Sequence, residues 1–329
     1  MSKILLNPGP TNTSFLTKFF QWIGSDQCHR EEEFQDTLCY IRNKILKKSG
    51  FYQTHEIAII CGSGTMGMQS MICSLVPNNV LVINSGTYAK RAIEMMRTYK
   101  IEHQSVECES IDDLKQNKKV KAVYFVENET STGENYCIDK MKKIYPNARF
   151  YIDATASFGA SNYQENVSKI AAISFCSNKC LQSTPGLSFV IWNKKQMKYE
   201  RCYYGDLSKY ELGKMPFTLP TQAVSALKHV VSIGINNKSI FDSRRDKLIK
   251  DMKSIGIKCY NKNPCNSIVA FIHPNRNYSS LHAFLKKKGM VIYSGVDGVE
   301  NSFRISTMSV KFDRKYKKIL RAFNDSCLH

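Results

Sequence analysis

The sequence predicts an α/β fold in which helices cover a mainly parallel β-sheet, followed by a smaller second domain. Short apolar, β-prone runs alternate with helical segments through residues 56–192. This alternation is typical of parallel strands joined by crossover helices. After about residue 240 the pattern changes to helices mixed with short strands. The chain has 329 residues, of which 43% are hydrophobic, so it is long enough to form more than one core.

The first two thirds supply the elements of the sheet. Residues 28–49 place Phe34, Leu38 and Ile41 on one helical face, and Gly50 is positioned to end that helix. The remaining elements expected in this part follow in chain order: strand 56–60, helix 65–75, strand 80–84, helix 88–99, strand 120–127, helix 139–145, strand 149–153, strands 171–177 and 188–192, and a helix that begins near Pro220.

The last third predicts the second domain, which combines helices and strands. The expected elements are a helix over 239–254, a strand over 266–273, a helix over 281–289, short strands over 290–294 and 302–306, and a basic helix from about 311. We therefore divide the chain into three parts. Residues 1–14 form a segment that packs on the small domain or the active site, residues 15–230 form the large domain, and residues 231–329 form the small domain.

Composition excludes several classes of protein. No run of about 18 apolar residues is present, so no transmembrane helix is expected. The N-terminus lacks an apolar segment of signal-peptide length, which predicts a cytoplasmic protein. The 12 cysteines form no CxxC pair and no zinc-type cluster, so we expect reduced thiols and no metal site. Cys176 and Cys180 flank Lys179, where simple packing is favoured over a redox role.

The charge of the chain is strongly positive, with a formal net charge of +19 and a pI near 9.4. Its lysines are scattered, and no RNA-binding signature or helix-turn-helix pattern accompanies them. A solvated, lysine-rich surface is therefore favoured over a nucleic-acid interface. Such a surface also attracts small anionic substrates.

Two charged residues at strand ends predict the chemistry. Asp153 closes the apolar run RFYID, and Lys179 lies on a short polar turn between two apolar runs. A pyridoxal phosphate (PLP) enzyme needs this pair, because a lysine amine holds the cofactor as a Schiff base and a carboxylate pairs with its ring nitrogen. Taken alone, Lys179 also fits a solvated turn lysine, and Asp153 fits a helix cap.

Other motifs have both a functional and an ordinary structural interpretation. The turn at 61–65, CGSGT, follows a strand and opens a helix. This placement suits either the binding of an anion at the helix start or a simple reversal of the chain. Tyr88 fits stacking on a planar ring or core packing. The segment 129–133, ETSTG, fits cofactor binding or a capping turn. Arg304 lies inside an apolar strand, where it either forms a structural ion pair or binds carboxylate or phosphonate oxygens.

Together these motifs resemble the class V aminotransferases of PLP fold type I, and within them the 2-aminoethylphosphonate–pyruvate aminotransferases. The resemblance runs nearly end to end. The segments that carry it are LLNPGPTNTS (5–14), CHREEEF (28–34), CGSGT, VINSGTYAKR, ENETSTG, YIDATASFG, SNKCLQSTPG and FTLPTQAV (217–224). It implies a large domain with a mainly parallel seven-stranded sheet and a smaller α+β C-terminal domain.

The resemblance also implies roles for site residues. Lys179 and Asp153 would be catalytic, as the cofactor-linked lysine and the partner of the ring nitrogen. The residues implied to bind the cofactor are Ser63, Gly64 and Thr65 at its phosphate, Tyr88 stacked on its ring, Thr130 at its hydroxyl side, and Thr221 at the phosphate in the neighbouring subunit. Arg304 would bind the substrate carboxylate or phosphonate, with Arg30 at the substrate mouth. Homodimers with shared active sites are implied.

The implied reaction transfers an amino group from 2-aminoethylphosphonate to pyruvate, giving phosphonoacetaldehyde and L-alanine, in either direction. Alanine–glyoxylate and serine–pyruvate aminotransferases are alternatives on the same scaffold. A PLP lyase is disfavoured because Asn178 stands where a cysteine desulfurase has histidine. The chain departs from the family at Glu127-Asn128-Glu129, where an HxE start is usual, and at Ser183-Thr184.

Overall fold

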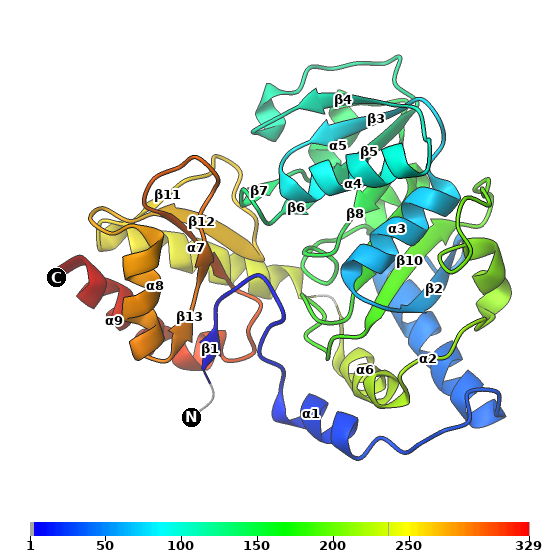
Figure 1. The fold of residues 1–329 in the computed structure, drawn as a ribbon, viewed down its shortest axis with the longest axis horizontal. Helices are drawn as coiled ribbons and strands as arrows, with labels where there is room; N and C mark the ends of the chain where they lie inside the picture. Colours follow the sequence, from blue (N-terminus) through cyan, green and yellow to red (C-terminus); the bar gives the residue numbers. More distant parts are fainter. Residues whose placement is uncertain (1–2, 236, 329) are drawn as a thin grey trace.

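The computed structural model describes residues 3–235 and 237–328. Its larger part is built on a seven-stranded sheet (Figure 1). In spatial order the strands are β2 (His55–Cys61), β10 (Leu187–Asn193), β9 (Ile170–Cys176), β8 (Arg149–Asp153), β5 (Ala122–Val126), β3 (Val80–Asn84) and β4 (His103–Glu107). Only β10 runs antiparallel to its neighbours, so the predicted mainly parallel α/β sheet is confirmed.

Helices bury both faces of this sheet, which explains why its central strands are almost continuously apolar. One face packs against α3 (Gly64–Leu75) and α4 (Thr87–Thr98). The other face packs against α2 (Glu32–Ser49), α5 (Ile138–Ile144) and α6 (Thr221–Ile233). The large part therefore has three layers, with a separate hydrophobic core on each side of the sheet.

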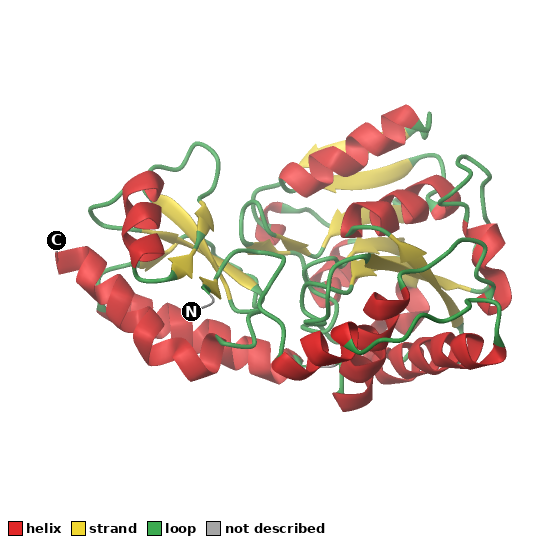
Figure 2. Cartoon of the chain, turned by 60° about the horizontal axis from the view of Figure 1, so that its bottom comes forward, coloured by secondary structure: helices red, strands yellow, loops and turns green. Residues whose placement is uncertain are grey.

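The smaller part has its own antiparallel sheet, and Figure 2 shows the two sheets as separate bodies of strands. Its strands lie in the order β11 (Lys258–Cys259), β12 (Ile268–Ile272), β15 (Ser302–Ser306) and β14 (Tyr293–Ser294). The helices α7 (Lys238–Ser254), α8 (Tyr278–Lys287) and α9 (Phe312–Leu328) contribute to one core with it. No helix in the described part of the chain has the length and apolarity needed to cross a membrane.

The N-terminal segment connects the two parts. β1 (Ile4–Leu5) pairs in parallel with β13 (Met290–Val291) of the small part, and Leu6 is buried in the core there. The chain then runs past the large part before α1 (Phe15–Trp22) begins. Near the middle of the chain, a two-stranded ribbon of β6 (Asn128–Glu129) and β7 (Glu134–Asn135) follows β5.

The start of α2 and the edge strand β4 are among the elements that differ from the sequence prediction. The helix expected over 28–49 begins only at Glu32, after turns in 28–31. Glu32 and Glu33 lie in its first turn, where the helix dipole favours acidic groups. Gly50, with φ +85°, ends the helix in the left-handed conformation, as predicted. The edge strand β4 was not predicted, because its sequence, HQSVE, is mostly polar.

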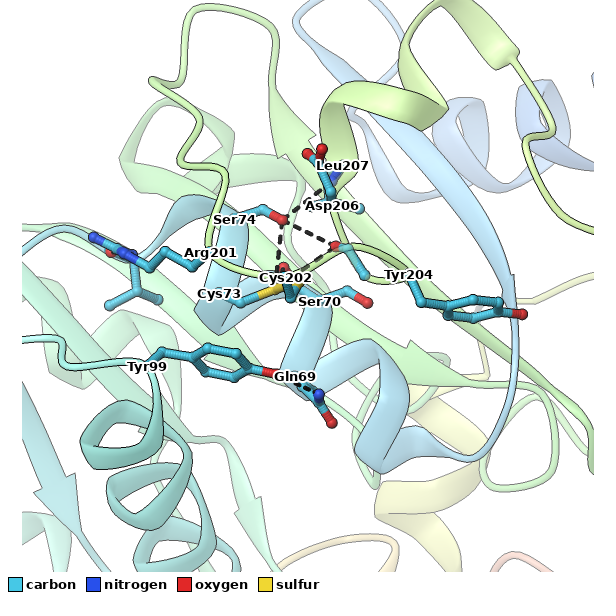
Figure 3. Close-up of a disulfide and its surroundings, with 12 residues drawn as sticks. Gln69, Ser70, Cys73, Ser74, Tyr99, Arg201, Cys202, Tyr204, Asp206 and Leu207 are labelled. Atoms are coloured by element: carbon cyan, nitrogen blue, oxygen red, sulfur yellow. Dashed lines mark hydrogen bonds between the residues drawn. A yellow bond between two sulfur atoms is a disulfide. The ribbon is translucent and has the colours of Figure 1, made fainter.

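The expectation of reduced thiols is wrong for one pair. Cys73 on the buried face of α3 forms a disulfide with Cys202, which lies 129 residues further along the chain (Figure 3). Ser74, next to Cys73, donates a 2.9 Å hydrogen bond to the carbonyl of Gly205 and accepts one of 3.1 Å from the amide of Leu207. The disulfide and these bonds hold the segment around 202–207 against α3.

Candidate active site

The carboxyl ends of six strands lie along one edge of the large sheet. All strands except β10 run in the same direction, so the loops that follow them emerge together. In an open α/β sheet this edge is the usual position of a ligand site. The predicted residues of the CGSGT turn, Tyr88, the ETSTG segment, Asp153 and Lys179 all follow these strand ends.

Lys179 lies on the turn that follows β9, and its side chain is half-buried. Gly9 of the N-terminal segment lies against its aliphatic part, since a Cβ at Gly9 would come within 3.0 Å of Lys179 Cε. The Nζ atom lies 6.0 Å from the centre of the Tyr88 ring. The structure therefore brings the predicted lysine and the predicted aromatic ring together, with Gly9 packed against the lysine.

Asp153 is at the end of β8 and is only 1% exposed. Its Oδ1 accepts a 2.9 Å hydrogen bond from the amide of Thr155. Burial raises the pKa of this carboxyl, and the hydrogen bonds from Thr155 and the positive charges of Lys179 and Arg91 oppose that rise. No ion pair joins Asp153 to Lys179 among the described residues, so a further cation near the carboxylate would favour its ionised form.

The start of α3 provides an anion-binding geometry. Ser63 is the N-cap residue, but its side chain makes no capping hydrogen bond to the first turn. Gly64 allows a close approach, because a Cβ there would lie 2.8 Å from Thr155 Cγ2. The Met66 amide donates to the carbonyl of Ser63 at 2.8 Å, whereas no hydrogen bond engages the amides of Gly64 and Thr65 among the described residues. These two amides, at the positive end of the α3 dipole, lie beside the loop that follows Asp153.

A second helix, α4, positions Tyr88. The amides of Tyr88 and Ala89 donate hydrogen bonds of 3.2 and 3.3 Å to Oε2 of the buried Glu129. Glu129 Oε1 accepts bonds of 3.0 and 2.5 Å from the amide and hydroxyl of Ser131. Burial raises the pKa of Glu129. This carboxylate therefore caps α4 and ties the ETSTG segment to the residue expected to stack on a ring.

Arg304 reaches the same segment from β15 of the small part. It is 6% exposed, and its Nη1 donates a hydrogen bond to the carbonyl of Thr130. Its Nε donates a 2.6 Å bond to the carbonyl of Ser294. Among the described residues no carboxylate forms an ion pair with it, so the structural ion pair considered from the sequence is absent. Burial lowers the pKa of this guanidinium.

Sequence analysis missed one cation of the site. Arg91 on α4 donates a 3.1 Å hydrogen bond from Nη1 to Thr65 Oγ1, and its Cζ lies 4.9 Å from the centre of the Tyr88 ring. A signal was available, because Arg91 is three residues after Tyr88 and so lies on the same face of the helix.

Two predicted residues stand apart in the structure. Thr221 opens α6, and Arg30 lies in the exposed turns before α2. Among the described residues, no hydrogen bond, ion pair or ring contact joins either of them to Lys179, Asp153 or Tyr88. A site within a single chain therefore does not account for their predicted roles.

Similar proteins have the same architecture. The solved aspartate aminotransferase of Thermus thermophilus matches with a TM-score of 0.87 and 20% identity, covering 98% of both chains. The alanine–glyoxylate aminotransferase of Nostoc matches with a TM-score of 0.86 and 16% identity, covering 100% of this chain and 96% of the other. The chain has the fold of the class V, fold-type I aminotransferases.

Curated relatives indicate which kind of aminotransferase the chain resembles in sequence. A 2-aminoethylphosphonate–pyruvate transaminase of Phocaeicola vulgatus is 26% identical over 357 aligned positions, covering 97% of each chain. One from Bacillus cereus is 28% identical, covering 93% of this chain and 92% of the relative. No family model matches the chain. The predicted resemblance to these transaminases is confirmed.

The site fits the cofactor of fold-type I aminotransferases. The half-buried amine of Lys179 can bond to its aldehyde, and within the described part of the chain no ion pair engages the buried Asp153. The start of α3, where Ser63 makes no side-chain cap and Gly64 carries no side chain, suits a phosphate. The structure does not support a redox role for Cys176 and Cys180. Both thiols are buried, and burial raises their pKa values to about 11 and about 12.

Proposed function

We propose that the protein is a PLP-dependent aminotransferase that exchanges an amino group between 2-aminoethylphosphonate and pyruvate. The products are phosphonoacetaldehyde and L-alanine, and the reaction is reversible. The observation that carries this proposal is the convergence of Lys179, Asp153 and Tyr88 at one edge of the sheet. The similarity to 2-aminoethylphosphonate–pyruvate transaminases along nearly the whole chain supports the choice of substrates.

Pyridoxal phosphate, when bound, supplies an aldehyde that accepts the amino group and a ring that withdraws electrons from the reacting carbon. Lys179 would hold this group through its amine, and the same amine would serve as the acid and base for the proton at the substrate carbon. Asp153 would pair with the ring nitrogen and favour its protonated form. Tyr88 would stack on the ring, and the start of α3 would bind the phosphate.

Substrate binding is assigned to Arg304. Its planar guanidinium matches the two oxygens of a carboxylate or phosphonate, and it has no carboxylate partner among the described residues. A buried cation without a partner is costly, so an anionic substrate would stabilise it. Arg304 also lines an open cleft of about 970 Å³ between the two parts, through which a small substrate can enter.

The working unit is proposed to be a cytoplasmic homodimer. Thr221 and Arg30, which do not contact the site within one chain, would then belong to the active site of the neighbouring subunit. The α1 helix supports a partner, because Phe15, Leu16 and Trp22 are 80%, 52% and 81% exposed. Exposed apolar side chains grouped on one helix are typical of protein interfaces.

The experiment that tests the function measures alanine. The purified protein, loaded with pyridoxal phosphate, is incubated with pyruvate and one amino donor at a time. We expect L-alanine to form with 2-aminoethylphosphonate, in amounts equal to the phosphonoacetaldehyde released. Rapid alanine formation from serine with none from the phosphonate would replace this proposal with a serine–pyruvate type. A glyoxylate preference over pyruvate would indicate the alanine–glyoxylate type.

A further inference from the structure

Arg91 is a cation placed beside the anion-binding end of α3 without a carboxylate partner. Its Nη1 donates to Thr65 Oγ1 at 3.1 Å, and no ion pair involves it among the described residues. It is half-buried, and its charge reaches into the site, where it opposes the rise in the pKa of Asp153. A surface arginine placed only for solubility would not meet these conditions.

The hydrogen bond to Thr65 has a consequence for the hydroxyl proton. Because Arg91 donates to Oγ1, the oxygen uses a lone pair in this bond and the Thr65 O–H stays available as a donor. The amides at the start of α3 are donors as well. Thr65, the helix start and the remaining N–H groups of Arg91 therefore form a set composed of donors, which suits an anion with several acceptor oxygens.

We propose that Arg91 is the specificity residue for the phosphate group of the cofactor, acting directly and through the hydroxyl of Thr65. This inference rests on the proposed function, since it assumes that the site holds pyridoxal phosphate. A phosphate dianion beside Arg91 gains a charge-assisted hydrogen bond that a neutral side chain does not provide. The protein should therefore prefer pyridoxal phosphate to pyridoxal, which lacks the phosphate, and Arg91 should carry much of that preference.

The contact between Arg91 and Tyr88 offers a rival explanation. The guanidinium carbon lies 4.9 Å from the ring centre, so Arg91 could act only by holding the ring in place. A role limited to Tyr88 would affect pyridoxal phosphate and pyridoxal equally, because both have the same ring. The ratio of the two affinities therefore separates the two roles.

The test measures dissociation constants of pyridoxal phosphate and of pyridoxal for the cofactor-free protein by absorbance titration. Arg91→Gln should raise the dissociation constant of pyridoxal phosphate by about 10- to 100-fold, the range for one hydrogen bond to a charged group. The dissociation constant of pyridoxal should stay nearly unchanged. Arg91→Lys should give an intermediate loss, because it keeps the charge without the fork. Arg97→Gln is the matched control, an exposed arginine in the last turn of the same helix.

A second readout does not depend on covalent attachment. In a Lys179→Ala background, inorganic phosphate should raise the melting temperature, and Arg91→Gln should remove most of that increase. An unchanged ratio of the two affinities in Arg91→Gln would overturn the inference while leaving the proposed function intact. A wild-type protein that binds neither pyridoxal phosphate nor pyridoxal would instead overturn the proposed function itself.

Discussion

Arg304 illustrates how the surroundings of a single residue bear on function. Its strand, SFRIS, is buried along its whole length. Within residues 3–235 and 237–328, the guanidinium donates only to backbone carbonyls and to the Ser294 hydroxyl. Tyr293 lies over it, with the ring centre 5.1 Å from Cζ. These contacts orient the planar group, and they leave N–H donors for an incoming anion.

Replacing Arg304 by lysine tests this assignment. We expect Arg304→Lys to raise the KM for pyruvate by about 10- to 100-fold, because the two-point fork to the carboxylate is lost while the charge remains. Steady-state kinetics with saturating 2-aminoethylphosphonate measures the change. Arg276→Lys is a suitable control in the same domain, since Arg276 bonds the carbonyl of Ser326 rather than the active site. Unchanged saturation by pyruvate would remove Arg304 from the substrate site.

Residues at the site also show how far sequence analysis reaches. Asp153, Lys179 and Tyr88 were predicted because each follows an apolar strand, and strand ends gather at one edge of a parallel sheet. The spacing of Arg91 from Tyr88 was a signal for their shared helical face, but the bond from Arg91 to Thr65 depends on α3 and α4 lying side by side, which no local pattern reveals. Glu129 was quoted as part of a motif, but its capping of α4 depends on a contact across about forty residues.

Among the elements, β12 is followed directly by a histidine, His273, with an unusual environment. His273 is fully buried, and its Nδ1 accepts hydrogen bonds of 3.1 and 3.0 Å from the amides of Asn275 and Arg276. An acceptor at Nδ1 requires a neutral ring, so Nε2 carries the proton and donates to Ser326 Oγ at 3.1 Å. Burial, with the positive charge of Arg276, lowers the pKa of His273 to about 4.

This histidine predicts a pH dependence of stability. Between about pH 6.5 and 4 the ring is protonated in the unfolded chain and neutral in the fold, so the free energy of unfolding should fall as the pH is lowered through this range. Urea unfolding at several pH values measures the slope. His273→Gln should make the slope shallower without abolishing it, because burial also lowers the pKa of His55 to about 4, and His282→Gln on α8 should leave the slope unchanged. An equal slope in wild type and His273→Gln would contradict the assignment.

The disulfide between α3 and the segment around 202–207 was not predicted from the sequence. Cys73 and Cys202 are 129 residues apart, with no spacing motif to connect them. Cys202→Ser should lower the free energy of unfolding by roughly 2–4 kcal/mol, because the unfolded chain loses a constraint. Denaturant unfolding without reductant measures the loss, and Cys39→Ser, at an exposed free thiol, is the control. Identical stability of the two variants, with no linked peptide in non-reducing mass spectrometry, would exclude the disulfide.

Element boundaries show the limits of local patterns. The apolar strands at the centre of the sheet were predicted because burial on both faces leaves continuous hydrophobic runs. The edge strand β4 lacks such a run, since four of its five residues are at least partly polar, and pairing with β3 alone determines it. The start of α2 was placed four residues early, because helix caps depend on backbone conformation more than on apolar spacing.

At the scale of the whole molecule, the large part, the small part and the N-terminal segment that connects them all contribute residues to the candidate site. Gly9 lies against Lys179 while β1 pairs with a strand of the small part, so the N-terminal segment links Lys179 to that part. Arg304 also reaches from the small part to Thr130 of the large one. Movement of one part relative to the other would therefore change the geometry around Lys179 and Arg304.

The proposed dimer predicts a measurable mass and a mutant that disrupts it. Sedimentation equilibrium should give twice the chain mass of 37.6 kDa. Trp22→Glu, which places a charge in the exposed apolar group of α1, should shift the population to monomer and lower activity. Tyr52→Glu, at an exposed aromatic outside α1, is the control. A wild-type monomer with full activity would contradict shared active sites.

An absorbance spectrum, recorded before and after addition of 2-aminoethylphosphonate, tests most directly the claim that one lysine amine and one facing carboxylate operate a bound B6 cofactor. The account predicts a visible band that disappears on addition of the donor and returns with pyruvate. Lys179→Ala should lack that band and should not retain the cofactor after borohydride reduction and denaturation, whereas Lys195→Ala should behave as wild type. A Lys179→Ala protein that still carries a reducible cofactor linkage, or a wild-type band that the donor leaves unchanged, would contradict it.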